Sequence, residues 1–205
     1  MAGLAWTHTT LKQALQYWLV EQTTSLGVND FTANIDTVIK LGELKLVRDI
    51  DLDIFDTTES VNTTAADEAV TKPTGCLVPR SIHYTSSGVT VPVLPRSYDY
   101  VKDYGGVGSP LYYAEKDTTT WILAPVSASQ VTLTVRHIKR PVSIVDTSPS
   151  WLGTNAPDAL LYACLIASEE FLKDNGQLGV WTKKYEEDVL PRTKEEFKLL
   201  KRSNY

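Results

Sequence analysis

The sequence predicts an α+β protein in which helices from both ends of the chain form a bundle and an antiparallel β domain is inserted between them. Three observations predict this fold class. Residues 1–50 carry apolar side chains at helical spacing, residues 51–149 are short β-type runs separated by Thr, Ser, Gly and Pro, and residues 150–205 return to helical spacing. We therefore expect a helical bundle made of residues 1–50 plus 150–205 and an inserted β-rich region at residues 51–149.

Two helices are expected before residue 50. Thr9 or Thr10 suits the N-cap of the first helix, which should end near Ser25–Gly27. The second opens at Asn29 or Asp30, and its apolar positions are Phe31, Ile35, Val38, Ile39, Gly42, Leu46 and Ile50. Glycine in a helix interior costs about 1 kcal/mol relative to alanine, so Gly42 indicates close packing of another helix.

The inserted region is predicted to be a sheet or a small barrel of short antiparallel strands. Polar and apolar residues alternate from Asp49 to Asp56, which predicts a half-buried strand. A short helix is expected at Ser97–Tyr104 and a flexible loop at Gly105–Pro110. The other predicted strands are Cys76–Tyr84, Val89–Leu94, Leu111–Glu115, Thr119–Ala124 and Gln130–Lys139.

The stretch Ser150–Lys173 is predicted to form the central helix of the bundle. Asn155 is expected to cap it, with Pro157 in the first turn, where a missing N–H has no intrahelical partner anyway. Its apolar residues cover more than half of the helix circumference, which is too wide for a surface helix. The core side chains expected here are Trp151, Leu160, Leu161, Cys164, Leu165 and Phe171.

A last helix is expected from about Gln177, and Pro191 should kink or end it. Its apolar stripe consists of Leu178, Trp181, Tyr185 and Val189. The segment Arg192–Tyr205 that follows is dense in charge and carries a small apolar patch.

The composition excludes several classes of protein. A net charge of −5 argues against broad binding of duplex DNA, which depends on clustered Lys and Arg. No apolar run is long enough to span a bilayer, and the N-terminus lacks the basic and apolar regions of a signal peptide. We therefore expect a protein made and kept in a cytoplasm, or in an assembly built there. Two cysteines cannot form a disulfide framework.

No motif indicates catalysis, a cofactor or a metal ion, so we expect a protein that is not an enzyme. The aspartates between residues 49 and 56 lack the glycine and glutamate of a calcium loop, because Ile54 and Ser60 stand in those places. The histidines and cysteines lack zinc-site spacing, and the glycines at 105–108 lack the dinucleotide-binding spacing. A pair of carboxylates that hydrolyses sugars stays an alternative.

A series of sequence blocks extends over most of the chain: Arg48–Asp56, Leu77–Arg80, Pro110–Ala114, Trp121–Pro125, Arg140–Pro141, Trp151–Leu152, Asn155–Asp158 and Leu160–Ala163. In its order and spacing, this series resembles the head-to-tail adaptor (connector) proteins of short-tailed bacteriophages. The resemblance implies a helical bundle with a β domain and a non-enzymatic virion protein at the head–tail junction, made in the cytoplasm of the host bacterium. It implies a ring of twelve copies that joins the portal to the tail nozzle. Genome DNA would pass through its channel without specific binding, and no membrane is involved.

A closed ring requires two different complementary faces on each subunit. The segment Arg192–Tyr205 is too short to be a stable lone helix, so we predict that it orders on the portal. The portal-binding residues of this hypothesis are Phe197, Leu199, Leu200 and Tyr205. The alternative function is a carbohydrate- or receptor-binding β module of a virion or cell-surface assembly. Its stacking faces would be Tyr98, Tyr100, Tyr104, Tyr112, Tyr113 and Trp121.

Overall fold

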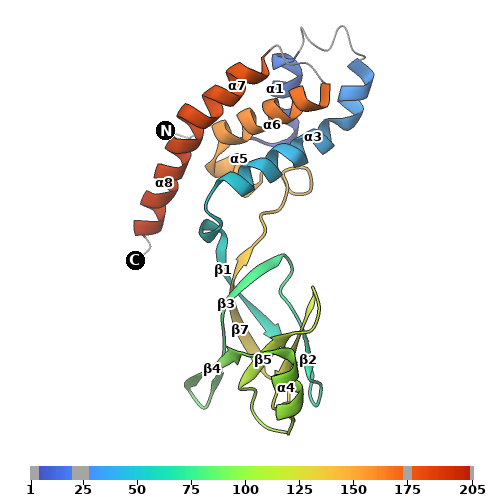
Figure 1. Ribbon diagram of the computed structural model, residues 1–205, viewed down its shortest axis with the longest axis vertical. Helices are drawn as coiled ribbons and strands as arrows, with labels where there is room; N and C mark the ends of the chain where they lie inside the picture. Colours follow the sequence, from blue (N-terminus) through green and yellow to red (C-terminus); the bar gives the residue numbers. More distant parts are fainter. Residues whose placement is uncertain (1–4, 20–27, 173–176, 204–205) are drawn as a thin grey trace. The chain divides into compact units, whose positions relative to one another are not determined.

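The computed structural model describes residues 5–19, 28–172 and 177–203 (Figure 1). The chain divides into two compact units. The helical unit comprises Met1–Ile54 and Pro141–Tyr205, and the sheet unit comprises Phe55–Arg140. Apart from the short helix α4 (Tyr98–Tyr104), the α-helices and a curled seven-stranded sheet occupy separate parts of the sequence, so the predicted α+β class is confirmed.

The helical unit begins with α1 (His8–Trp18), whose N-cap lies two or three residues before the predicted caps, Thr9 and Thr10. Thr7 is the N-cap, because its hydroxyl accepts the Thr10 N–H at 3.2 Å while the Thr10 hydroxyl accepts the Thr7 N–H at 3.0 Å. Leu11 and Leu15 face inward and are fully buried. The predicted end of this helix at Ser25–Gly27 lies outside the described residues.

The predicted strand at Asp49–Asp56 is wrong. The helix α3 (Val28–Asp49) is followed by a 3-10 helix, η1 (Leu52–Phe55), and β1 begins only at Asp56. The Asp51 carboxylate accepts the Asp53 N–H at 3.0 Å, and the Asp51 carbonyl accepts the Ile54 N–H at 3.3 Å. Aspartate forms such turns readily with its own following backbone, and this local chemistry overrides the alternating pattern.

The predicted central helix consists of two helices, α5 (Trp151–Asn155) and α6 (Pro157–Leu172). Asn155 is the last residue of α5, and its side-chain amide donates to the Trp151 carbonyl at 2.9 Å, so its predicted role as a cap of α6 is wrong. Ser150 caps α5 by accepting the Gly153 N–H at 3.1 Å. Pro157 is the first residue of α6, the position that tolerates proline.

Side chains of α6 are buried almost all round the helix. Leu160, Leu161, Cys164 and Leu165 are buried, and Trp151 of α5 is half-buried. The prediction of Phe171 as a core side chain is wrong, because it lies in the last turn of α6 and is 38% exposed. The helix α3 lies directly against α6 at Gly42, where an added Cβ would lie 2.7 Å from Cys164 Cα and from its Sγ. The close packing predicted from this glycine is confirmed.

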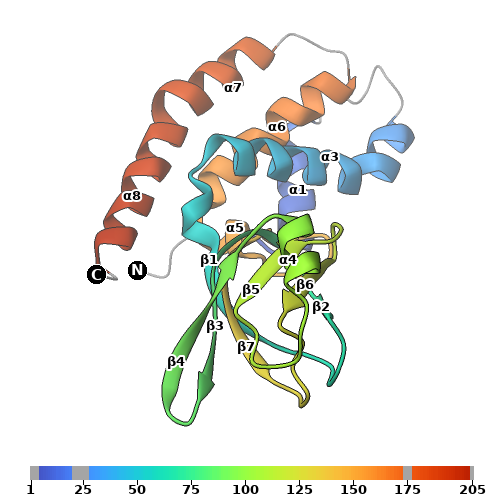
Figure 2. The same ribbon diagram turned by 60° about the horizontal axis from the view of Figure 1, so that its bottom comes forward.

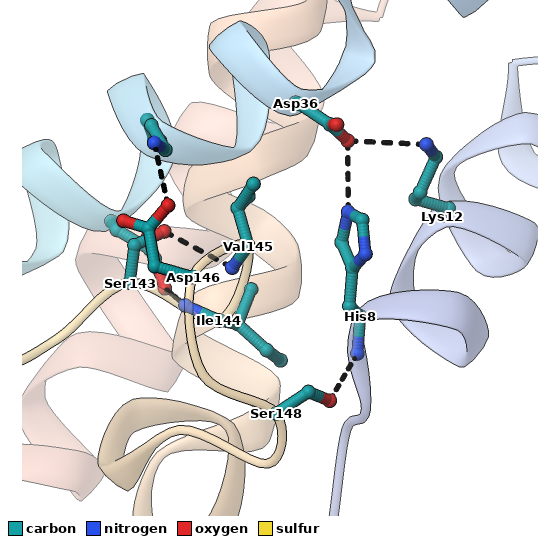
Figure 3. A network of polar contacts seen from close by, with 10 residues as sticks. His8, Lys12, Asp36, Ser143, Ile144, Val145, Asp146 and Ser148 are labelled. Atoms are coloured by element: carbon teal, nitrogen blue, oxygen red, sulfur yellow. Dashed lines mark hydrogen bonds and ion pairs between the residues drawn. The ribbon is translucent and has the colours of Figure 1, made fainter.

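Hydrogen bonds join the N-terminal segment to the chain that follows the sheet unit. The Trp6 backbone N–H donates to the Gly153 carbonyl at 2.9 Å, and the His8 backbone N–H donates to Ser148 Oγ at 2.8 Å. The His8 ring meets the Asp36 carboxylate at 2.8 Å (Figure 3). Burial opposes ionisation of Asp36, but hydrogen bonds from His8 and Lys12 outweigh it and hold the pKa of Asp36 below its ordinary value.

The last helix continues through Pro191 instead of ending there. It is made of α7 (Leu178–Lys184), a π-helical segment η2 (Tyr185–Val189) and α8 (Leu190–Ser203), which follow one another without a break (Figure 1). The Leu190 N–H donates to the Tyr185 carbonyl, five residues back. This wider turn makes room for a proline ring that would clash with the carbonyl four residues before it in a regular α-helix.

The sheet unit contains seven strands in the order β1-β7-β3-β4-β5-β6-β2. The five strands predicted after residue 75 are confirmed within two residues at each end, and β1 and β2 were not predicted. The strands are β1 (Asp56–Asn62), β2 (Ala69–Thr71), β3 (Cys76–Ser86), β4 (Val89–Pro95), β5 (Tyr112–Glu115), β6 (Thr120–Ala124) and β7 (Thr132–Lys139).

The sheet is mixed, so the expectation of purely antiparallel strands is wrong at one pair. β4 and β5 are parallel because the chain between them crosses over through the short helix α4 (Tyr98–Tyr104). All other neighbouring strands are antiparallel, and β3 and β4 form a two-residue hairpin at Ser87 and Gly88 (Figure 2). Both turn residues have positive φ, which this kind of hairpin requires.

Candidate interaction surfaces

A cavity of about 300 Å³ opens on the helical unit between the end of α3, η1 and α8, and we call it the α3–α8 cavity. Its apolar part is formed by Ile50, Ile54 and Phe197, and two of these side chains, Ile50 and Phe197, are only 5% exposed. Asp49 and Asp51 line it from the α3 side, and Lys194 and Lys198 line it from α8. A cavity with an apolar floor and charged walls suits an apolar side chain that is flanked by charges.

The two aspartates that line this cavity already accept hydrogen bonds from groups of the helical unit. The Asp49 carboxylate accepts the Tyr185 hydroxyl at 2.8 Å and lies 3.6 Å from the Lys45 ammonium. Burial, together with this hydrogen bond, raises the pKa of Tyr185 far above its ordinary value, so the hydroxyl remains a donor. The Asp51 carboxylate accepts a backbone N–H. Within the described residues, neither Lys194 nor Lys198 makes an ion pair.

The predicted portal-binding residues lie in different surroundings. Phe197 is buried against the Trp151 ring, with 5.3 Å between ring centroids, so its predicted contact with a portal groove does not fit this position. Leu199 is 63% exposed on the outer face of α8. The Leu200 side chain and Tyr205 lie outside the described residues. The segment from Arg192 to Ser203 is helical without any partner, because it extends η2 and buries Thr193 and Phe197.

No group of three or more His, Cys, Asp or Glu side chains is placed to hold a metal ion in residues 5–19, 28–172 and 177–203. The acidic run is dispersed: Asp49 bonds to Tyr185, whereas Asp56 lies on β1 and pairs with Arg136 on β7. Burial raises the pKa of both the Cys76 and Cys164 thiols, which keeps them protonated at neutral pH.

A sequence model of the family described as SU10 adaptor protein matches residues 6–196. The chain belongs to the SU10 adaptor protein family. The match runs from the segment before α1 into α8, and therefore covers both units. It confirms the resemblance to phage head-to-tail adaptors, so the protein is a structural adaptor of a bacteriophage. A search of curated proteins finds no match to the chain.

Membership of the adaptor family implies association with portal and tail proteins, fits a position at the head–tail junction of the virion, and implies that the adaptor is not an enzyme. Among the described helices of the adaptor, none combines the length and apolarity needed to cross a bilayer.

The sheet unit of the adaptor carries a second surface feature, a cluster of three tyrosines. Tyr100 and Tyr104 of α4 and Tyr112 of β5 lie with ring centroids 5.0–6.0 Å apart. The Arg96 guanidinium lies over Tyr100 at 5.8 Å and over Tyr112 at 5.5 Å. Tyr113 and Trp121, which were also predicted as stacking faces, are buried in the core of the sheet.

The residues of the α3–α8 cavity were not predicted as a group. The sequence places Asp49 to Ile54 about 140 residues before Lys194 to Lys198, and only the fold brings them together. One signal was present, because Lys194 and Lys198 are one helical turn apart and like charges at this spacing repel.

Proposed function

We propose that the adaptor forms a ring of twelve copies beneath the portal, provides the platform for the tail nozzle, and continues the channel through which the genome leaves the head. The observation that carries this proposal is the family match over residues 6–196. A head-to-tail ring needs a rigid subunit with two different faces. The buried contact of α3 with α6 makes the helical unit compact, and the sheet unit and α8 each offer a surface to neighbouring proteins.

The charge distribution supports passage of DNA without binding. Residues 55–140 carry eight acidic and eight basic side chains, so the whole net charge of −5 falls on the helical unit. Neutral and acidic surfaces do not accumulate the phosphate contacts that hold a duplex. Genome DNA would therefore slide past this protein.

We assign the portal contact to the C-terminal end of α8 and the residues after it, which include Leu200 and Tyr205. Phe197 is excluded from it because its ring packs on Trp151. A deletion of all residues after Arg192 would also remove the buried Phe197. A loss of portal attachment could then not be distinguished from a loss of folding. A deletion of residues 200–205 removes Leu200 and Tyr205 but keeps Phe197 and its packing on Trp151.

The test compares the full-length adaptor with this truncated form, each mixed with the portal protein of the same phage. We expect the full-length chain to add a defined ring to the portal, measured as particle mass, and the truncated chain to fold normally but to attach at least about tenfold more weakly. Full-length protein that leaves the portal mass unchanged would contradict the proposed function. Normal attachment of the truncated form would contradict only the assignment of the portal contact.

Recognition of a glycan or receptor by the sheet unit is a second candidate function, favoured by the tyrosine cluster. Tyr100 and Tyr104 are each almost half exposed, but Arg96 covers the faces of Tyr100 and Tyr112. Tyr104 is the ring left to stack on a sugar. Binding in a glycan screen that disappears in Tyr104→Ala would support this candidate, and a screen with no binding would remove it.

A further inference from the structure

The outer face of α8 carries an exposed leucine between carboxylates. Leu199 follows Phe197 by two residues, so the two side chains point about 200° apart around the helix. Phe197 is 5% exposed and faces inward, whereas Leu199 is 63% exposed. Glu195 and Glu196 are exposed and lie one turn before Leu199, on the same side of α8.

The inner face of α8 carries the opposite charges beside the cavity. Lys194 and Lys198 line the cavity and make no ion pair within the described residues, whereas Lys184 and Arg192, earlier in the same continuous helix, both pair with Asp188. Asp49 across the cavity is already bonded to Tyr185. The charged side chains of the cavity that have no partner among the described residues are therefore Lys194 and Lys198.

We propose that Leu199 of one copy inserts into the α3–α8 cavity of the next copy in the ring, with its Glu195 and Glu196 against the neighbour's lysines. The inserting face and the receiving face are opposite sides of the same helix, so the contact joins different surfaces and can repeat from copy to copy. The cavity of about 300 Å³ has an apolar floor of Ile50, Ile54 and Phe197 for the leucine. This inference rests on the proposed ring, and it assigns Leu199 to the neighbouring copy and not to the portal.

Charge exchange tests the contact. One full-length variant carries Lys194→Glu with Lys198→Glu, a second carries Glu195→Lys with Glu196→Lys, and a third carries all four substitutions. A control carries Lys183→Glu with Glu187→Lys. This exposed pair lies on α7 and η2, away from the cavity. Each is mixed with the portal protein, and the mass of the particle and its salt dependence are measured after circular dichroism has shown normal folding.

Each double variant should lose ring assembly by about tenfold or more in affinity, and the fourfold variant should regain it, because every copy then presents both inverted faces. The control should assemble as the wild type does. Normal assembly of the double variants on a portal that binds wild type would overturn this inference alone. Loss without recovery in the fourfold variant would assign these charges to the portal and also overturn it. A wild-type chain that forms no ring would overturn the proposed function as well.

A covalent link provides an independent check. In a Cys76→Ser background, Leu199→Cys combined with Ile54→Cys should form disulfides between copies on the assembled particle and give a ladder of covalent oligomers. Either single cysteine should give none, and Cys164 is fully buried and cannot substitute for it. Absence of the ladder from correctly assembled rings would overturn the inserted position of Leu199.

Discussion

Gly42 is the residue at which α3 and α6 approach most closely, and its missing side chain is what permits the approach. A Cβ at this position would lie 2.7 Å from Cys164 Sγ and 2.8 Å from its backbone nitrogen, closer than real side chains come. Backbone atoms cannot move aside as the end of a flexible side chain can. The two helices would have to separate.

We predict that Gly42→Ala destabilises the protein by about 1–3 kcal/mol, although alanine favours helix by about 1 kcal/mol in an open position. Gly179→Ala is the matched control, since a Cβ there meets nothing within 4 Å in α7, and it should be neutral or slightly stabilising. Urea unfolding of both variants measures the difference. Equal stability of Gly42→Ala and wild type would mean that the helices do not pack as described.

Glu43 is a buried acid that holds the chain where it re-enters the helical unit. Its carboxylate accepts the Ile144 N–H at 2.8 Å, and the Ser143 hydroxyl also bonds to it. Burial raises the pKa of Glu43 above its ordinary value, and these hydrogen bonds offset the effect only in part. The folded protein therefore binds this proton more tightly than the unfolded chain does.

The raised pKa of Glu43 determines in which direction its contribution to stability changes with pH. The contribution of Glu43 to stability is fully present below its unfolded pKa and is lost as pH rises through its folded pKa. We predict that Glu43→Gln, whose amide oxygen still accepts the Ile144 N–H, gains stability relative to wild type as pH increases from about 4 to 7. Melting temperatures of the two proteins across this range provide the measurement. A difference that stays constant with pH would show that Glu43 does not titrate differently on folding.

At the scale of elements, strong periodic patterns were sufficient to predict strands in the core of the sheet. Hydrogen bonds between a side chain and its neighbouring backbone, which form turns, could not be read from these patterns. Each strand predicted between residues 76 and 139 is present, because alternation of apolar residues reports directly on a face packed in a core. β1 escaped prediction because it lies at the edge of the sheet and Val61 is its sole large apolar residue. Asp49–Asp56 alternated without being a strand because Asp51 closes a turn.

The candidate site was less predictable than the fold. The apolar residues of Arg192–Tyr205 were recognised, but their directions depend on the register that η2 gives to α8. Phe197 turns inward to Trp151 and Leu199 turns outward, a distinction that composition cannot provide. The opposite wall of the cavity comes from a different end of the chain, which only the packing of both ends into one unit reveals.

At the scale of the whole molecule, the sheet unit is an insertion whose two ends are neighbours. β1 begins where β7 ends, since Asp56 pairs with Ile138, so residues 55–140 enter and leave the unit side by side. The unit has its own core around Trp121, Leu133 and Val135. An insertion of this kind does not need the rest of the chain to close its sheet.

We therefore predict that a fragment of residues 55–140 folds alone into a β-rich domain with a cooperative thermal transition, followed by circular dichroism and by dispersion of its NMR spectrum. A fragment of residues 63–140 is the control. It lacks β1, leaves one side of β7 without a partner along seven residue pairs, and should be markedly less stable or unfolded. An unfolded 55–140 fragment would show that the sheet depends on the helices.

The π-helical turn at Tyr185–Val189 makes α8 sensitive to chain length in a way that surface loops are not. One residue removed from it would restore ordinary α-helical winding and rotate everything downstream by about 100°. Lys198 would then take the place of Phe197 beside Trp151. The presence of one residue in this short stretch therefore sets the rotation of α8 about its axis. That rotation determines which side chains of α8 are buried and which are exposed to a partner.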